Sequence, residues 1–343
     1  MQDLIDQLNE GTALNPAQIA DVAMHLVDAA ISSESKAAFL KALHSKGETP
    51  DEIAGFVNEF LKLAVDPGLV PATIPGPMLD VVGTGGDKLH LFNVSTTAMF
   101  IMAAGGVCIV KHGNRGITSK AGGADVLEAL GVKIDLPVPR LAECVRQHGA
   151  GFLFAPLYHP AFAAVKEARA LLAAEGGRSI FNILGPLLNP ARPDYQLVGV
   201  FDEALTPTFG VILQKLGRKA AWVVHGCTND GRGMDELSIL GPNSVTELRD
   251  GVLKHHTVRW TPASGATVED LAGGDAKENA GILEGILSGS IQGPKREMAM
   301  LNATAGFVIT GKANDLAEGA AQAGEILDRG AAHAKLRALQ EFR

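Results

Sequence analysis

The segment MLDVVGTGGD, residues 78–87, consists of an apolar strand that runs directly into a glycine turn. Glycines in such a turn let successive backbone N–H groups converge on an anion. The turn is not a dinucleotide-binding fingerprint, because the G-x-G-x-x-G spacing counted from Gly83 requires glycine where this chain has Lys88. We therefore predict a strand followed by a phosphate-binding turn. A tight strand-to-helix connection without a ligand is the alternative.

Short apolar segments continue beyond this turn and alternate with helical segments. The further strand candidates are Val107 to Val110, Gly151 to Phe154, Leu197 to Phe201 and Ala221 to Val224. This alternation predicts an α/β fold with a mainly parallel sheet that helices cover on both faces. Ligands of such sheets bind at the carboxyl ends of the strands. The C-terminal helices are predicted over Glu278 to Leu287, Lys295 to Ile309 and Leu316 to Phe342.

The region before the turn carries no strand signal and is predicted to form four helices within residues 1–66. Asn15 before Pro16 is a helix N-cap signal, and Thr49 with Glu52 forms a capping-box pattern. Four prolines, at 67, 71, 75 and 77, mark a stiff linker. We therefore expect a small all-helical N-terminal domain over residues 1–72, with a returning helical segment at about 160–187. The larger α/β domain is expected over residues 73–159 and 188–343.

Composition excludes several classes of protein. The 343 residues include 40 glycines and three cysteines without C-x-x-C spacing, and the formal net charge is -8. Neither a disulfide framework nor a cysteine zinc site is expected, and a reducing cytoplasm fits this cysteine usage. No signal-peptide pattern is present, and the longest apolar stretch, residues 98–110, is too short to span a membrane. The acidic balance disfavours a broad nucleic-acid surface, although it permits a local anion site.

Two polar segments follow consecutive predicted strands. Asn93 to Thr97 places hydroxyls and free amides at a helix N-terminus, where either phosphate binding or simple N-capping is possible. Lys111 to Lys120 carries three cations among glycines, and Gly122 and Gly123 follow. Solvated loop charge is the alternative for this second segment. Because both loops leave neighbouring strands at one end of the sheet, we favour a polyphosphate site.

An acidic pair and one arginine complete the candidate site. Asp235 and Glu236 are adjacent carboxylates, which can share Mg²⁺ with a pyrophosphate or lie on the surface. Arg169 can hold a substrate carboxylate in bidentate fashion, and an ordinary surface arginine is the alternative.

Several segments, taken in order, resemble anthranilate phosphoribosyltransferases. They are GTGGD (83–87), FNVST (92–96), KHGNRG (111–116), GGADVLEALG (122–131), GFLFAPLYHPA (151–161), FNILGPLLNP (181–190), DELS (235–238), ENA (278–280) and LNA (301–303). The resemblance implies a helical domain hinged to an α/β domain, and a homodimer joined through the helical domains. The implied reaction joins anthranilate to phosphoribosyl pyrophosphate (PRPP), gives phosphoribosyl-anthranilate and pyrophosphate, and belongs to tryptophan biosynthesis. Association with an anthranilate synthase subunit is left open.

The resemblance also implies roles for individual residues. Asn114 and Arg169 would position anthranilate, and Ser95, Asp235 and Glu236 would serve two Mg²⁺ ions. No general base is nominated, since His112 and His159 qualify only by residue type. The full set of candidate substrate-binding residues is Gly83, Thr84, Gly85, Gly86, Asp87, Asn93, Val94, Ser95, Thr96, Lys111, His112, Gly113, Asn114, Arg115, Ser119, Gly123 and Arg169.

The chain departs from the family pattern at four places. The family's usual DGxxTFN is DKLHLFN here, and its usual GSAD serine is Gly123. The segments between Arg169 and Arg178 and from Gly226 to Gly233 are also longer than the pattern. These changes put acceptor identity in question more than the phosphoribosyl site. The alternatives are a pyrimidine nucleoside phosphorylase, a phosphoribosyltransferase with another aromatic acceptor, and a non-catalytic nucleic-acid-binding paralogue.

Overall fold

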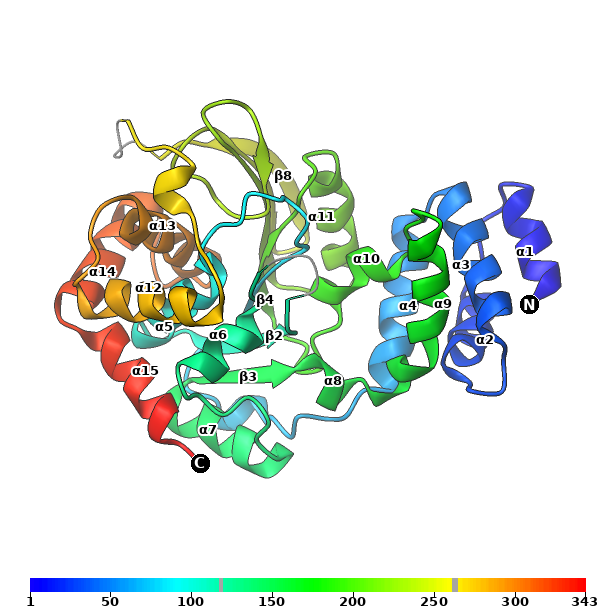
Figure 1. Cartoon of the computed structure of the whole chain (residues 1–343), viewed down its shortest axis with the longest axis horizontal. Helices are drawn as coiled ribbons and strands as arrows, with labels where there is room; N and C mark the ends of the chain where they lie inside the picture. The colour runs from blue at the N-terminus through cyan, green and yellow to red at the C-terminus, as the bar shows by residue number, and fades with distance from the viewer. Residues whose placement is uncertain (117–119, 261–264) are drawn as a thin grey trace.

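The computed structural model describes residues 1–116, 120–260 and 265–343, and it contains a helical bundle beside a larger α/β body (Figure 1). Each of the four predicted N-terminal helices is present. They are α1 (Gln2–Asn9), α2 (Pro16–Val27), α3 (Ser33–Lys46) and α4 (Pro50–Lys62). Both predicted N-caps are confirmed, because Asn15 accepts from Gln18 N–H and Thr49 accepts from Glu52 N–H.

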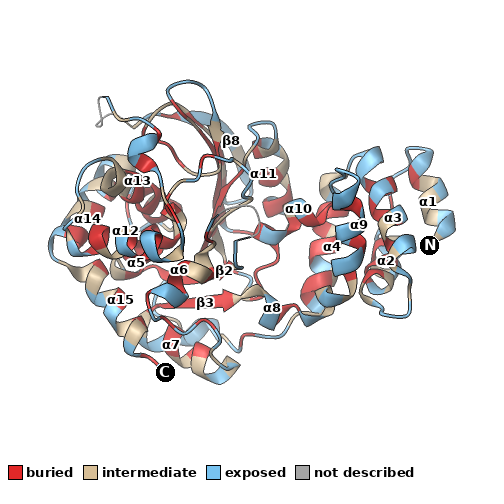
Figure 2. Cartoon of the chain, viewed as in Figure 1, coloured by how far each residue is buried: buried red, intermediate tan, exposed pale blue. Residues whose placement is uncertain are grey.

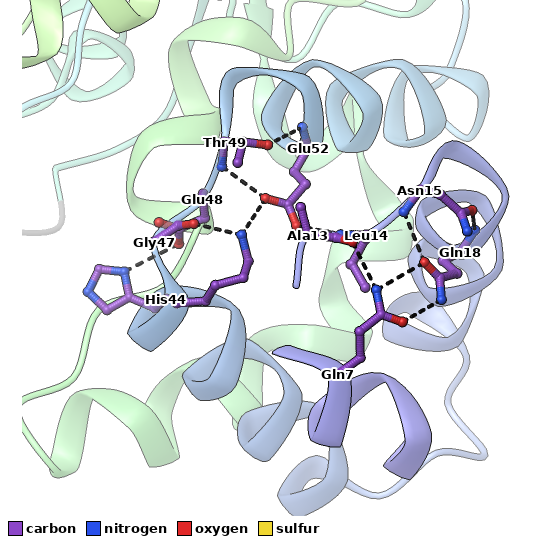
Figure 3. A network of polar contacts seen from close by, with 11 residues as sticks. Gln7, Ala13, Leu14, Asn15, Gln18, His44, Gly47, Glu48, Thr49 and Glu52 are labelled. Carbon is purple, nitrogen blue, oxygen red and sulfur yellow. Dashed lines mark hydrogen bonds and ion pairs between the residues drawn. The ribbon is translucent and has the colours of Figure 1, made fainter. Parts of the chain in front are cut away.

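A buried polar network holds the bundle together (Figure 3). The Glu52 carboxylate accepts hydrogen bonds from Leu14 N–H at 2.9 Å and from Lys46 Nζ at 2.7 Å. Burial by itself raises the pKa of Glu52, but these bonds and those from Thr49 lower it overall. Glu52 therefore stays ionised and ties the start of α4 to the α1–α2 loop and to the end of α3.

A segment from the middle of the chain packs against this bundle. It contains η2 (Pro160–Val165), α9 (Lys166–Ala174) and α10 (Phe181–Leu184), which follow α8 (Ala155–Tyr158) and precede η3 (Gly185–Leu187). Leu172 and Phe181 share one apolar core with Phe39 and Phe60. Lys36 Nζ in α3 donates to the carbonyl of Ala164 at 2.8 Å. Figure 1 shows α9 beside α3 and α4.

The body is built on one eight-stranded sheet with the order β3-β2-β1-β4-β5-β7-β8, in which β6 pairs with β5. The first five strands are parallel and confirm the predicted strands, with bounds shifted by up to a few residues. The strands are β1 (Met78–Gly83), β2 (Cys108–Gly113), β3 (Ala150–Phe154), β4 (Tyr195–Gly199), β5 (Ala220–Cys227), β6 (Gly233–Met234), β7 (Asn243–Arg249) and β8 (Val252–Val258).

The antiparallel pair β7 and β8 was not predicted from the sequence. These strands form a hairpin whose two turn residues, Asp250 and Gly251, both have positive φ. Asp-Gly is a strong hairpin signal, so the turn could have been recognised. The exposed, polar β8 lacks the apolar run of a central strand.

Helices cover both faces of the sheet, as predicted. The face with the largest apolar core carries α5 (Val94–Ala104), α6 (Gly123–Ala129), α12 (Ala276–Ser288), α13 (Pro294–Ile309), α14 (Leu316–Asp328) and α15 (Ala331–Glu341). The opposite face carries α7 (Val138–His148) and α11 (Leu205–Lys215). Most of α5 is buried, in keeping with its apolar sequence (Figure 2).

The single C-terminal helix predicted over Leu316 to Phe342 is wrong. The chain forms two helices, α14 and α15, which meet at Gly330 with φ +68°. Glycine adopts this left-handed conformation without strain, so the chain can turn at Gly330 between the end of α14 and the start of α15. None of the helices in the described ranges is long and apolar enough to cross a lipid bilayer.

Candidate active site

The glycine turn and the acidic pair meet at the carboxyl ends of β1 and β4. Gly83 and Gly199 pair across these two strands. A Cβ on Gly83 would lie 2.3 Å from Asp235 Oδ2, and a Cβ on Gly199 would lie 1.6 Å from the Asp235 carbonyl oxygen. Gly85 N–H donates to Asp235 Oδ2 at 2.6 Å. The two glycines therefore make the space that Asp235 occupies.

The predicted metal ligands Ser95, Asp235 and Glu236 are brought together from two separate segments. Asp235 and Glu236 follow β6, and Glu236 Oε1 accepts from Ser95 N–H at 3.2 Å in the first turn of α5. Lys111 Nζ, at the end of β2, donates to Ser95 Oγ at 3.1 Å. A cation, a hydroxyl and two carboxylates thus share one site.

Both carboxylates hold protons more tightly than usual. Burial first, and Asp87 second, raise the pKa of Asp235 to about 7. Burial and Asp235 raise the pKa of Glu236 to about 8, and Lys111 opposes this rise. Two adjacent carboxylates that resist ionisation form a site where a divalent cation can relieve their repulsion.

The donor set fits Mg²⁺ as a partial coordination shell. The available ligands are carboxylate and hydroxyl oxygens, which Mg²⁺ prefers. Within the described ranges, no cluster of three or more His, Cys, Asp or Glu side chains is arranged to hold a metal. Mg²⁺ is commonly bound by one or two protein carboxylates, with water and substrate phosphate as its other ligands.

Lys111 is a buried ammonium, only 4% exposed. Its Nζ also donates to the carbonyl of Val81 at 2.5 Å. Burial lowers the pKa of Lys111, whereas Asp80, Glu236 and Asp235 raise it. A Cβ on Gly123 would lie 3.1 Å from Thr96 Oγ1 and 3.6 Å from Lys111 Cε, so these three predicted residues are neighbours.

The basic loop after β2 is folded onto α6 by Asp125. Its Oδ2 accepts from Gly116 N–H and from Gly122 N–H, each at 2.8 Å. Arg115, one of the predicted substrate-binding residues, forms ion pairs with Glu128 and Asp125. In this structure Arg115 therefore braces the loop and is not a free cation. The predicted Ser119 lies outside the described residues.

The other predicted residues of this loop have short-range roles. Asn114 Oδ1 accepts from Arg115 N–H at 2.8 Å, and a Cβ on Gly113 would lie 3.0 Å from Phe152 Cζ. His112 is buried beside His159, with 5.3 Å between ring centroids. Burial, together with His159, lowers the pKa of His112 to about 3, so its ring is neutral.

The predicted residues of the first loop include several that shape the backbone. Thr84 Oγ1 accepts from Phe201 N–H at 3.1 Å, and Gly86 has φ +96°. Asp87 Oδ1 accepts from Leu89 N–H at 3.1 Å. Gly85 and Gly86 in this turn are exposed to solvent.

The start of α5 differs from the simple capping alternative. Asn93 occupies the N-cap position without a capping bond from its side chain. Its Nδ2 donates to the carbonyl of Ala121 at 3.2 Å, and its Oδ1 accepts from Asn279 Nδ2 at 2.8 Å. Val94 is buried in the core. Asn93 thus joins the start of α5 to the loop before α6 and to α12, and Asn279 is a partner that we did not predict.

Arg169 does not contact the cluster around Lys111 in this structure. It lies on α9 with its guanidinium 5.4 Å from the Phe181 ring centroid. From Phe181 a row of neighbouring rings leads to the sheet. The ring centroids of Phe181 and Phe162 are 5.5 Å apart, and those of Phe162 and His159 are 5.1 Å apart. His159 in turn contacts His112 on β2. The row thus runs from Arg169 on α9 to His112 on β2.

Asp80 is a polar residue of the site region to which the sequence analysis gave no role. It is fully buried in β1, and its Oδ1 accepts from His112 N–H at 3.2 Å. Burial raises its pKa to about 6, although Asn189 and Lys111 oppose the rise. A carboxylate in the middle of an otherwise apolar strand was the available signal.

Comparison with known proteins agrees with this arrangement. Residues 2–64 match the model described as "Glycosyl transferase family, helical bundle domain", and residues 75–333 match "Glycosyl transferase family, a/b domain". The anthranilate phosphoribosyltransferase of Anaeromyxobacter sp. (strain K) is 42% identical over 343 residues, covering 99% of this chain and 97% of that protein. The enzyme of the same name from Desulfosudis oleivorans is 46% identical over 309 residues, covering 89% and 87%.

Solved structures give the same result. The crystal structure of anthranilate phosphoribosyltransferase from Thermus thermophilus matches with a TM-score of 0.89 and 37% identity, covering 99% of each chain. The Saccharomyces cerevisiae enzyme in complex with PRPP and Mg matches with a TM-score of 0.84 and 26% identity, covering 98% of this chain and 97% of that one. The chain belongs to the anthranilate phosphoribosyltransferase family.

Proposed function

We infer that this chain transfers the phosphoribosyl group of PRPP to anthranilate, giving N-(5-phosphoribosyl)anthranilate and pyrophosphate in tryptophan biosynthesis. The observation that carries the inference is the convergence of Ser95, Lys111 and the pair Asp235–Glu236 at the glycine turn. This group of residues suits a negatively charged leaving group with its metal. The row of rings toward Arg169 suits an aromatic acid.

The residues act mainly by placing charge and by orienting the two substrates. Lys111 would stabilise the negative charge that grows on pyrophosphate as its bond to ribose C1 breaks, together with backbone N–H groups of the turn. When bound, Mg²⁺ offsets the same charge, and Asp235, Glu236 and Ser95 would hold it. The anthranilate amine is already a nucleophile, so orientation by Arg169 and Asn114 takes the place of a strong base.

Further features of the family are part of this proposal. We propose two Mg²⁺ ions, a homodimer joined through the helical bundles, and a cytoplasmic location. We also propose that the bundle with residues 160–187 forms one domain and the sheet with its helices the other.

One assay tests the function. The purified protein with PRPP, Mg²⁺ and anthranilate should remove anthranilate fluorescence, and chelation of the metal with EDTA should stop the loss. Matched reactions with other aromatic amines, and with thymidine or uridine plus phosphate, test the alternatives. Turnover of any of these in place of anthranilate would overturn the acceptor assignment.

Arg169→Ala should weaken the use of anthranilate specifically. Loss of a bidentate contact to a carboxylate is expected to raise the KM for anthranilate about tenfold or more. The KM for PRPP should stay within about twofold, because Arg169 lies at the far end of the ring row. Steady-state kinetics check both values, with Lys166→Ala on the same helix as the matched control. An unchanged anthranilate KM would remove Arg169 from the acceptor site.

Activation by Mg²⁺ should depend on pH. Because the carboxyls of Asp235 and Glu236 titrate near 7 and 8, protons compete with the metal below these values. The Mg²⁺ concentration for half-maximal activity should therefore rise as pH falls from 8 to 6, by up to about tenfold per pH unit for each proton displaced. Titrations of Mg²⁺ at saturating PRPP and fixed ionic strength measure this. A constant requirement across that range would contradict the assignment.

A further inference from the structure

An arginine that the sequence analysis left without a role lies beside the glycine turn. Arg178 is exposed and belongs to the connection between α9 and α10, which bridges the helical bundle and the sheet in Figure 1. Its guanidinium carbon lies 5.4 Å from the centroid of the Phe201 ring, just after β4. Arg178 thus reaches from the bundle side of the molecule to the end of the sheet.

Phe201 is itself built into the turn. Its N–H donates to Thr84 Oγ1 at 3.1 Å, and its Cδ1 lies 4.0 Å from the position of a Cβ on Gly86. The Phe201 ring is therefore near both the Arg178 guanidinium and the glycine turn. An arginine stacked on a ring keeps the N–H donors at its edge free for a phosphate.

The charges around Arg178 leave it available for a ligand. Among the described residues no carboxylate forms an ion pair with it. The nearest acids in sequence to Phe201 are committed elsewhere: Asp202 accepts from Ala204 N–H at 3.0 Å, and Glu203 accepts from the Ser244 hydroxyl. Arg115, by contrast, is bound to Glu128 and Asp125. Arg178 is therefore an exposed, unpaired guanidinium stacked beside the turn.

We propose that Arg178 binds a phosphate group of PRPP at the open side of the glycine turn. The proposal rests on the proposed function, and it adds a cation from the bundle side to a phosphate site otherwise formed by the α/β body. Phosphate oxygens accept the parallel N–H bonds of a guanidinium, and the Phe201 ring lies beside the Arg178 guanidinium. Arg169 lies on α9, and Arg178 lies in the connection that follows this helix. A contact between Arg178 and a PRPP phosphate would therefore also position Arg169 relative to PRPP.

The test compares Arg178→Gln and Arg178→Lys with Arg146→Gln, a substitution of an exposed arginine on α7. Isothermal titration with pyrophosphate plus Mg²⁺, and separately with ribose 5-phosphate, identifies the phosphate group that Arg178 contacts. We expect Arg178→Gln to weaken binding of one of them about 10- to 30-fold and to raise the KM for PRPP equally. The KM for anthranilate should change less than about twofold, and Arg178→Lys should recover part of the loss.

A second variant tests the contribution of the Phe201 ring separately from that of the Arg178 charge. Phe201→Leu removes the ring and leaves the guanidinium, so we expect a weaker effect of about threefold on the same binding constant. Unchanged affinity for both anions in Arg178→Gln would overturn the proposal, and so would a rise confined to the anthranilate KM. Anion binding needs no turnover, so a failure of the proposed function would appear in the wild-type assay and not in these titrations.

Discussion

Replacing Asp235 with Asn together with Glu236 with Gln should lower kcat/KM by about 10³-fold or more. The double variant keeps the shape of the site but removes both charges that would hold Mg²⁺ against the departing pyrophosphate. Single-turnover and steady-state assays with PRPP and anthranilate measure the loss. Glu269→Gln with Asp270→Asn, an exposed pair of the same residue types, is the matched control and should keep full activity.

The same double variant should make the empty protein more stable at pH 8. Folding raises the pKa of Asp235 to about 7 and of Glu236 to about 8, whereas the unfolded chain releases these protons near pH 4. The folded state therefore binds more protons between pH 4 and 8, and the stability of the wild type falls as pH rises through this window. The gain at pH 8 is on the order of 1–3 kcal/mol. Thermal unfolding without metal measures it, and a variant less stable than wild type at pH 8 would contradict the burial of these charges.

Gly199→Ala should inactivate the enzyme through a single methyl group. A Cβ at this position would lie 1.6 Å from the carbonyl oxygen of Asp235, which is far inside van der Waals contact. Strand β4 is held on both sides by β1 and β5, so it cannot move away and the acidic segment must shift. We expect a loss of activity of about 10²-fold or more, with destabilisation of about 2–4 kcal/mol.

The control for this variant is Gly281→Ala, in the middle of α12, where an added Cβ meets no atom within 4 Å. It should raise stability by about 0.5–1 kcal/mol and leave activity unchanged, because alanine is the better helix former. Denaturant unfolding and the anthranilate assay compare both variants. Wild-type activity in Gly199→Ala would show that the acidic segment is not fixed as the structure has it.

The sequence predicted features that depend on neighbouring residues. Thr49 and Glu52 are three residues apart, so their capping box could be recognised directly. The five parallel strands followed from apolar runs between glycine turns, and their common direction placed Ser95 and Lys111 at one edge. Local pattern and sheet topology were enough for this part of the site.

Features that depend on distant partners could not be predicted in this way. Arg115 was expected near the phosphates because its charge was visible, but its partner Glu128 is 13 residues away on α6. No role was predicted for Arg178, because its partner Phe201 follows β4 and the sequence does not show that the two side chains meet. Nothing in the sequence around Gly199 indicates that the Asp235 carbonyl oxygen fills the space where a side chain at position 199 would lie. Such contacts exist only after the chain has folded.

Asp235 and Glu236 lie side by side in a partly buried site, so we expect bound Mg²⁺ and PRPP to stabilise the folded chain. Any ligand that binds only the folded state adds a stability of RT ln(1 + [L]/Kd), about 2.7 kcal/mol at 100 times Kd. Proteases and chaperones act on the transiently unfolded fraction, so the abundance of the protein in the cell follows the stability that the ligand adds. A cell well supplied with the donor substrate would thus retain more of this protein at the same rate of synthesis, and starvation would clear it.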